Sequence, residues 1–345
     1  MLSPDGGHEA ILSQKPSLAF DEHGDFEKQK KQIKNKLTEL LGTMPERVDL
    51  NPVVEYQKEE DAYTEYRIRF KVEEHVEAVC LLCIPKLGKE KYPLMVCLQG
   101  HVKGMQVSLG RTYSEDDDPP SEDDCDFGLQ GIERGYAVLC LEQRGMGERR
   151  TVKVERKEEL INDNGYPRCH VTAMTAIMLG RTLIGERCWD VSRAIDLALT
   201  YPQIDGERII CTGLSGGGTT TYYSACMDER IKIAIPSGAV CTFKDSIHAM
   251  DHCVCNYIPQ LSLYMDMGEM AALIAPRKLI VVNGNEDMIF PDAGVREVYA
   301  TIEKIYKAAG VPENCMLVTG SGGHRYYKKE TWAAFDSMCE GSDYI

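Results

Sequence analysis

Six short runs of consecutive apolar residues restrict the fold of this chain more than any other feature. They are PLMVCL (93–98), YAVLCL (136–141), RIICTGL (208–214), KIAIP (232–236), KLIVVN (278–283) and CMLVTG (315–320). Such runs are typical of strands buried on both faces of a mainly parallel sheet. Segments with helical spacing lie between most of them, at 127–135, 190–202, 217–228 and 294–310. The alternation predicts an α/β fold with a mostly parallel, doubly wound sheet.

The N-terminal part of the chain follows a different pattern. Residues 26–41 have helical spacing that Gly42 can end, and residues 63–72 and 76–84 predict a hairpin. We therefore expect an N-terminal helical extension over residues 1–55 and a main α/β domain over residues 56–345. Long connections at 148–185 and 237–275 interrupt the alternation, and we expect these helical insertions to form a lid or a small subdomain.

The charge of the chain excludes some classes of partner. Its formal net charge is -15, which argues against nucleic acid and disfavours anionic membrane surfaces. No apolar stretch approaches the roughly 20 residues of a membrane helix, and the N-terminal residues lack the features of a signal peptide. We expect a cytoplasmic protein. The acidic segment 114–126 is interpreted as a solvated loop rather than a calcium site, because no Gly occupies the central position.

The chain contains 14 cysteines. Five of them lie in the predicted strands, where we expect buried free thiols: Cys80, Cys83, Cys97, Cys140 and Cys211. The segment His252-Cys253-Val254-Cys255 is a better candidate for metal binding. No second Cys/His pair lies nearby in the sequence to complete four ligands. We therefore interpret this segment as structural and expect neither a metal nor a cofactor.

Ser215 lies in the stretch CTGLSGGGTT (211–220), directly after an apolar run and directly before a helical segment. A nucleophile elbow requires this strand–turn–helix context, and Gly213 and Gly217 relieve the crowding around the serine. A phosphate-binding Walker loop is a weaker interpretation, because no Lys follows the glycines. The stretch therefore predicts a serine nucleophile.

The order of residues along the chain selects the partners of this serine. Three histidines follow it: His248, His252 and His324. In this fold class the acid comes next and the histidine last. The loop after run 278–283 offers Glu286 and Asp287, and only His324 lies beyond them. We prefer Asp287 as the acid, with Glu286 as the alternative.

An oxyanion hole needs two backbone donors. The amide of Gly216 follows the nucleophile directly, and the loop QGHVKG (99–104) follows an early strand. Gly100 would allow close approach of the backbone, so we expect the His101 amide to be the second donor. These groups suit acyl transfer from an ester to water.

Five segments together resemble the α/β-hydrolase superfamily: QGHVKG (99–104), LEQRGMGER (141–149), GLSGGG (213–218), NGNEDMIFP (283–291) and GGHR (322–325). More narrowly, the chain resembles bacterial acetyl-xylan-esterase-like and dienelactone-hydrolase-like serine hydrolases. The resemblance implies a triad of Ser215, Asp287 and His324. It also implies hydrolysis of a small ester through an acyl-enzyme, with acetylated carbohydrates as the family-level substrate class.

Three motifs depart from those of the sugar and cephalosporin deacetylases. Those enzymes carry R-G-Q, G-x-S-Q-G and H-E, where this chain has Arg144-Gly145-Met146, Gly213-Leu214-Ser215-Gly216-Gly217 and His324-Arg325. The departures bear on the substrate rather than on the fold. Two alternatives stay open: a serine peptidase of the prolyl-oligopeptidase type, and a non-catalytic binding protein on the same fold.

Three other side chains are candidates for substrate binding. Arg144 follows an early strand, and we favour a structural arginine paired with a loop carboxylate over recognition of a substrate carboxylate. Tyr257 and Tyr264 lie in the second insertion, where they would line a pocket or form its small core. The helix at 26–41 is a candidate surface for a homo-oligomer.

Overall fold

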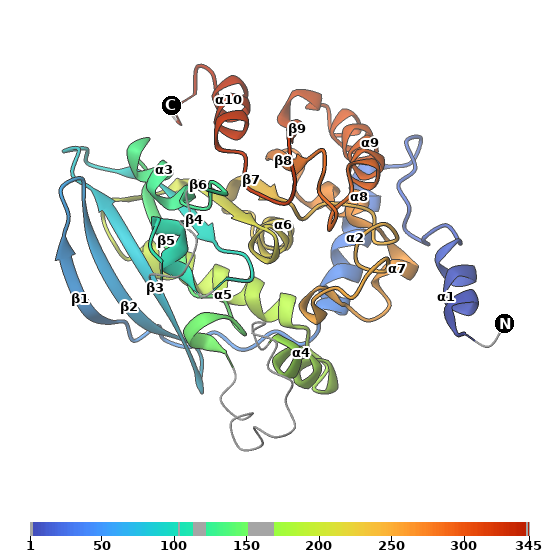
Figure 1. The fold of residues 1–345 in the computed structure, drawn as a ribbon, viewed down its shortest axis with the longest axis horizontal. Coiled ribbons are helices and arrows are strands. Elements are labelled where there is room, and N and C mark those ends of the chain that lie inside the picture. The colour runs from blue at the N-terminus through green and yellow to red at the C-terminus, as the bar shows by residue number, and fades with distance from the viewer. Residues whose placement is uncertain (1–2, 103, 113–121, 151–168, 343, 345) are drawn as a thin grey trace.

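The computed structural model describes residues 3–102, 104–112, 122–150, 169–342 and 344. Nine strands of these residues form one sheet, in the order β1-β2-β3-β5-β4-β6-β7-β8-β9 (Figure 1). In chain order, the strands are β1 (Val53–Glu59), β2 (Tyr63–Glu73), β3 (Val76–Pro85), β4 (Tyr92–Leu98), β5 (Ala137–Leu141), β6 (Ile204–Leu214), β7 (Ile231–Ser237), β8 (Lys278–Gly284) and β9 (Cys315–Gly320). All six apolar runs are strands, so the predicted α/β fold is confirmed.

The first three strands are antiparallel, and β3 also pairs antiparallel with β5. Every neighbouring pair from β5 to β9 is parallel. The predicted hairpin is therefore β2 and β3. Strand β1 was not predicted, because all its residues are exposed and its sequence carries no apolar face. The mainly parallel part places the ends of β4, β6, β8 and β9 at one edge of the sheet.

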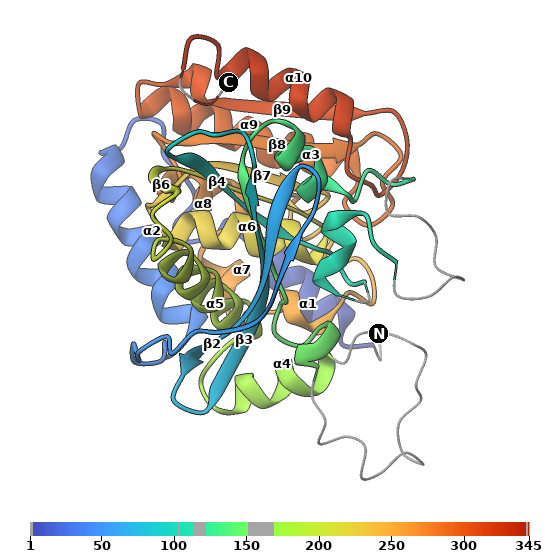
Figure 2. The same cartoon turned by 90° about the vertical axis from the view of Figure 1, so that its left-hand side faces the viewer.

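Helices cover both faces of the sheet (Figures 1 and 2). In chain order, they are α1 (Asp5–Leu12), α2 (Phe26–Leu41), α3 (Phe127–Glu133), α4 (Cys169–Met178), α5 (Leu183–Ala198), α6 (Gly216–Met227), α7 (Leu261–Tyr264), α8 (Met267–Met270), α9 (Asp292–Ala308) and α10 (Lys328–Met338). One core cluster joins α2, α5, α6 and α9 to the sheet, and a second joins α3 and α10 to its other face. The layers are those of a doubly wound sheet.

Helix α5 begins earlier than predicted. The apolar spacing predicted a helix over 190–202, whereas the structure places α5 at Leu183–Ala198. Thr182 caps its first turn, with the Thr182 Oγ1 accepting a hydrogen bond from the Gly185 amide at 3.1 Å. The first two turns bury charged side chains, which include Arg187 and Asp190. Because buried charges mask the apolar period of a helix, the sequence pattern places the start of α5 too late.

Helix α2 packs onto the same face of the sheet through Ile33, Leu37 and Leu41, all of them buried. The Lys30 ammonium also donates a hydrogen bond to the Ala275 carbonyl oxygen at 2.6 Å. The division of the chain near residue 55 stays a prediction.

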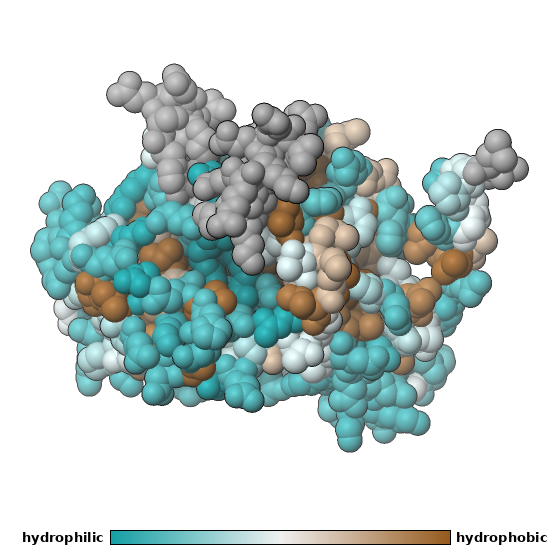
Figure 3. All heavy atoms as spheres, turned by 90° about the horizontal axis from the view of Figure 1, so that it is seen from below, coloured by the Kyte–Doolittle hydropathy of each residue, from teal (hydrophilic) through white to brown (hydrophobic). Residues whose placement is uncertain are grey.

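The two insertions differ in how far the structure describes them. Residues 151–168 of the first and most of the acidic segment (114–121) lie outside the described residues, whereas the second insertion contains α7 and α8. Figure 3 views the face on which α4 lies, and apolar side chains gather near its centre. Helix α4 contributes exposed Val171, Met174 and Met178. The lid stays a prediction.

In the described part of the chain, no helix is both long enough and apolar enough to cross a membrane.

Candidate active site

Ser215 occupies a sharp turn between β6 and α6. Its φ of 57° and ψ of -121° lie in a region that non-glycine residues rarely adopt. The Ser215 amide donates a hydrogen bond to the Ser237 carbonyl oxygen at 2.9 Å, which ties the turn to the end of β7. Strained turns of this kind persist only where the surrounding structure holds them.

Three glycines bring α6 against the sheet behind this turn. A Cβ on Gly213 or Gly217 would overlap the Leu98 carbonyl oxygen at the end of β4. A Cβ on Gly218 would overlap the Ser237 carbonyl oxygen. The third glycine of the run therefore has a packing role, because it lets α6 lie close to β7.

Asp287 and His324 meet at the ends of β8 and β9. The Nδ1 of His324 lies 2.7 Å from the Oδ2 of Asp287. The Oδ1 of Asp287 accepts hydrogen bonds from the amides of Ile289 at 2.8 Å and Phe290 at 3.0 Å. Burial would raise the pKa of Asp287, but these bonds and the charge of His324 outweigh burial and lower it. The neighbouring Glu286 is exposed.

The His324 ring lies beside the serine turn. It stacks on Phe290, with ring centroids 5.8 Å apart and planes inclined by 19°. A Cβ on Gly238 would lie 2.8 Å from the His324 Cε1, and Gly238 follows the Ser237 carbonyl that holds the serine amide. The Nε2 of His324 is buried and has no hydrogen-bond partner among the described residues. This nitrogen is free to exchange a proton with a nearby hydroxyl.

The loop after β4 lies on the other side of the serine. A Cβ on Gly100 would lie 3.3 Å from the Ser215 Cβ. The His101 ring covers Gly216, where a Cβ would approach the His101 Cε1 to 2.6 Å. The Gly216 amide opens α6, and an amide of a first helical turn has no acceptor within the helix. The structure thus brings the loop that carries the His101 amide next to Ser215 and Gly216. The oxyanion role of the two amides stays a prediction.

Glu142 lies under this loop, and sequence reasoning did not single it out. Its carboxylate accepts hydrogen bonds from the Gln99 amide group at 2.8 Å and from the Met105 backbone at 3.3 Å. Burial raises the pKa of Glu142 to about 7. The sequence does contain a hint of this residue, because Glu142 directly follows the apolar run 136–141. A carboxylate at the end of a buried strand needs hydrogen-bond partners.

A cluster of one imidazole and three thiols borders the same loop. The ligand atoms of His101, Cys169, Cys253 and Cys255 lie within 4.8 Å of one another. The Cys255 Sγ is 3.4 Å from the His101 Nε2 and 3.2 Å from the Cys253 Sγ. The sequence offered no second Cys/His pair near Cys253 and Cys255 to complete four ligands, but the fold brings His101 and Cys169 to them. His252 is not among these four donors, and its Nδ1 lies 3.0 Å from the Asn256 amide nitrogen.

The residues of the cluster shift one another's pKa values. Hydrogen bonds from the Cys253 and Cys255 thiols, together with Arg187, hold the pKa of Cys169 well below the usual range of a thiol. Burial alone would lower the pKa of His101, but hydrogen bonding to Cys169 and Cys253 outweighs burial and raises it to about 9.

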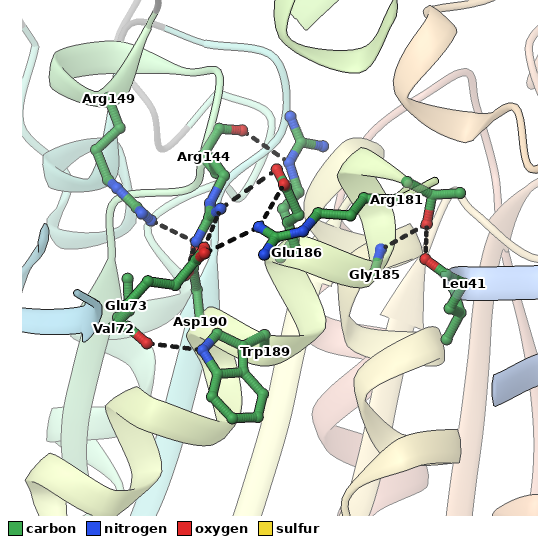
Figure 4. A network of polar contacts seen from close by, with 12 residues as sticks. Leu41, Val72, Glu73, Arg144, Arg149, Arg181, Gly185, Glu186, Trp189 and Asp190 are labelled. Atoms are coloured by element: carbon green, nitrogen blue, oxygen red, sulfur yellow. Dashed lines mark hydrogen bonds and ion pairs between the residues drawn. The ribbon is translucent and has the colours of Figure 1, made fainter. Parts of the chain in front are cut away.

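Arg144 belongs to a network of ion pairs at the end of β2 and the start of α5 (Figure 4). Its guanidinium binds Asp190 through two nitrogens, at 2.7 and 3.1 Å, and Glu73 at 2.6 Å. The other members are Arg149, Arg181 and Glu186. With 9% of its side chain exposed, Arg144 fits the structural interpretation that the sequence favoured.

The two predicted pocket tyrosines have other partners. The Tyr257 hydroxyl donates a hydrogen bond to the Ile247 carbonyl oxygen at 3.0 Å. The Lys36 ammonium of α2 lies 4.3 Å from the centroid of the Tyr264 ring. Within the described ranges, neither tyrosine has a hydrogen bond or a ring contact with the Ser215 turn or His324. Their role in substrate binding stays a prediction.

His252 is a further ring near the site that sequence reasoning set aside. The His252 ring contacts Phe290 edge-on, with ring centroids 5.5 Å apart. Phe290 is also the ring on which His324 stacks. Burial lowers the pKa of His252 to about 4, so this ring is neutral at physiological pH.

Comparisons with known proteins agree with the architecture. The family model described as "Abhydrolase family" matches residues 3–344. A curated relative, the putative hydrolase YtaP of Bacillus subtilis (strain 168), is 24% identical over 301 residues, which cover 84% of this chain and 92% of YtaP.

Two solved structures share the fold. A putative acetyl xylan esterase from Bacteroides fragilis has a TM-score of 0.76 at 18% identity, covering 95% of this chain and 83% of that one. A glucuronoyl esterase from Solibacter usitatus has a TM-score of 0.68 at 15% identity, covering 95% and 98%. The resemblance inferred from the motifs is confirmed, and the chain belongs to the Abhydrolase family.

Proposed function

We propose that this protein is a serine hydrolase of carboxylic esters. The observation that carries the proposal is the contact of 2.7 Å between His324 and Asp287 beside the strained turn of Ser215. Nucleophile, acid and base come from the ends of three parallel strands, in the chain order that α/β-hydrolases use. No other group of described residues combines a strained serine with an oriented histidine.

In the proposed mechanism, the His324 Nε2 takes the proton of the Ser215 hydroxyl as the oxygen attacks the ester carbonyl. Asp287 holds the Nδ1 proton of the ring and stabilises the imidazolium that forms. The amides of Gly216 and His101 donate hydrogen bonds to the developing oxyanion. The histidine then protonates the leaving alcohol, and water activated by the same ring releases the acyl group.

The substrate class is a carbohydrate ester. Proteins of this fold include ones named acetyl xylan esterase and glucuronoyl esterase, and both names describe esters of sugars. An acetylated sugar places the carbohydrate on the alcohol side of the ester, whereas a glucuronoyl ester places it on the acyl side. The first choice is the substrate class that the family resemblance implies, and it is the one that we propose.

The test compares the wild-type protein with Ser215→Ala and with the control Ser262→Ala in the second insertion. We expect wild type and control to hydrolyse p-nitrophenyl acetate and to react covalently with a fluorophosphonate probe. Ser215→Ala should lose both properties, with kcat/KM lower by about 10⁴-fold or more.

Wild-type protein that is folded by circular dichroism but unreactive toward the probe would contradict the proposal and favour a non-catalytic protein. Faster cleavage of a dipeptide amide than of the acetyl ester would favour the peptidase alternative. Acetylated xylo-oligosaccharides and a methyl glucuronate ester then distinguish the two sides of the sugar ester.

A further inference from the structure

The four side chains of the thiol–imidazole cluster converge from three distant parts of the chain. His101 lies in the loop after β4, and Cys169 is the first residue of α4. Cys253 and Cys255 lie at the short 3-10 turn η4 (Val254–Asn256) of the second insertion. Cys169 and Cys255 are buried, and His101 and Cys253 are partly buried. Three sulfurs and one imidazole nitrogen are a donor set that favours Zn²⁺.

The spacing of the donor atoms fits a tetrahedral ion. Zn–S bonds of about 2.3 Å and tetrahedral angles separate two bound sulfurs by about 3.8 Å. All four donor atoms lie within 4.8 Å of one another, and the Cys255 Sγ lies 3.2 Å from the Cys253 Sγ and 3.4 Å from the His101 Nε2. Changes of at most about 1 Å in the distances between donor atoms would complete the geometry around the ion. The contact between Cys253 and Cys255 is well beyond a disulfide bond, whose sulfurs lie about 2.05 Å apart.

The charges around the cluster support a divalent cation. Arg187 is 1% exposed, and its Nη2 donates a hydrogen bond to the Cys169 Sγ at 3.1 Å. Its Nε donates to the Arg144 carbonyl oxygen at 2.9 Å. Among the described residues, Arg187 has no carboxylate partner, because the nearby carboxylates pair with the three arginines of the Figure 4 network. The charges of three thiolates, one divalent cation and Arg187 cancel, which is the condition for burying them together.

The surroundings also resemble a second coordination shell. The Arg187 guanidinium donates to one sulfur, and Asn256 donates weakly to the Cys255 Sγ at 3.8 Å. Apolar side chains, Met146 and Leu183 among them, pack around Cys169 and Cys255. Metal sites in proteins are typically oriented by such hydrogen bonds and shielded by such side chains.

We propose that His101, Cys169, Cys253 and Cys255 bind one Zn²⁺ ion in a closed, structural site. Four protein ligands leave no open position for a substrate, so the ion acts on the fold. It ties both insertions to the loop that carries the His101 amide. His101 is then a positioning residue whose side chain fixes the place of its own backbone donor.

The test measures zinc in the full-length protein, produced with zinc and a reductant and without chelators. We expect about one zinc ion per chain in the wild type. Ser215→Ala should bind the same amount, which separates this proposal from the proposed hydrolysis. Cys253→Ser should bind zinc at least tenfold more weakly, whereas the control Cys315→Ser, which changes an equally half-buried thiol on β9, should match the wild type.

A second measurement on the wild type does not depend on a variant that folds. Co²⁺ should replace the zinc and give the strong absorption of thiolate-to-cobalt charge transfer, and zinc should abolish that absorption. Wild-type protein that binds no zinc when the metal is supplied would overturn the proposal. A zinc content that Cys253→Ser leaves unchanged would overturn it as well.

Discussion

At the scale of single residues, Asp287 and Glu286 are neighbours that the sequence left as alternatives for the acid, and their environments differ. Asp287 is buried and accepts three hydrogen bonds, one of them involving His324, whereas Glu286 is exposed. A carboxylate held in this way orients an imidazole and stabilises its charged form. Only one of the two acids is placed for that work.

Replacing this acid gives a matched pair of variants. Asp287→Asn keeps the size of the side chain but favours the wrong tautomer of His324, so we expect kcat on an aryl acetate to fall by about 10⁴-fold. Glu286→Gln should change kcat by less than about twofold, because an exposed acid outside the hydrogen-bonded set contributes little. Equal losses in the two variants would contradict the assignment.

The residues of the proposed triad are easier to predict from the sequence than those of the cysteine cluster, for a physical reason. Ser215, Asp287 and His324 each follow a strand, and strand ends of a parallel sheet meet at one edge, so chain order alone brings them together. The four residues of the cluster lie in loops and at a helix start. Their meeting depends on how two insertions fold over the sheet, which local periodicity does not encode.

At the scale of elements, the approach of α6 to the sheet depends on glycines. Gly217 faces the Leu98 carbonyl and Gly218 faces the Ser237 carbonyl. A larger residue at either position would place its Cβ too close to a backbone carbonyl oxygen. Backbone atoms cannot move aside as the end of a flexible side chain can. The same helix carries the Gly216 amide and follows Ser215, so its displacement would also disturb the candidate active site.

Gly218→Ala tests this packing. We expect the free energy of unfolding to fall by about 3 kcal/mol, because the added methyl group forces α6 away from β7. Gly7→Ala is the control, since a Cβ at that position of α1 would meet no atom within 4 Å. It should leave stability unchanged or raise it by up to about 1 kcal/mol. Urea unfolding measures both, and equal stability of the two variants would contradict the argument.

The boundaries of helices and strands could be predicted from the sequence where the buried face of the element is apolar, and could not where it is not. The predicted runs match strands β4 to β9 within a few residues, because most residues of β4 to β8 are buried on both faces. Strand β9, at the edge of the sheet, is partly buried but keeps an apolar run. Strand β1 is exposed along its length, and α5 buries charges in its first turns. Strand β1 has no buried face to produce an alternating pattern, and the buried charges of α5 hide its apolar period.

At the scale of the whole molecule, buried Glu142 couples stability to pH. Its pKa of about 7 lies above the ordinary value of 4.5, so the folded protein holds this proton more tightly than the unfolded chain. The stabilising contribution is complete below about pH 4.5 and is lost as the pH rises through 7. A pKa difference of this size corresponds to about 3 kcal/mol.

Glu142→Gln removes this titration. The Gln99 Oε1 is buried without a partner among the described residues, so a flipped Gln99 amide can accept a hydrogen bond from the new Gln. Relative to wild type, we expect the variant to gain up to about 3 kcal/mol of stability between pH 5 and pH 8. The exposed Glu340→Gln should show no such trend. Urea unfolding at several pH values measures the difference, and a parallel pH profile of variant and wild type would refute the role of Glu142.

The strand order has a consequence for the chain during its synthesis. The serine turn follows β6, but its base follows β9, which is added to the sheet after β7 and β8. At about 5–20 residues per second, a ribosome completes the Ser215 turn roughly 5–20 s before it reaches His324. Under the proposed mechanism, a nascent chain therefore carries Ser215 without its base, and the serine becomes reactive only after the last strand of the sheet has joined.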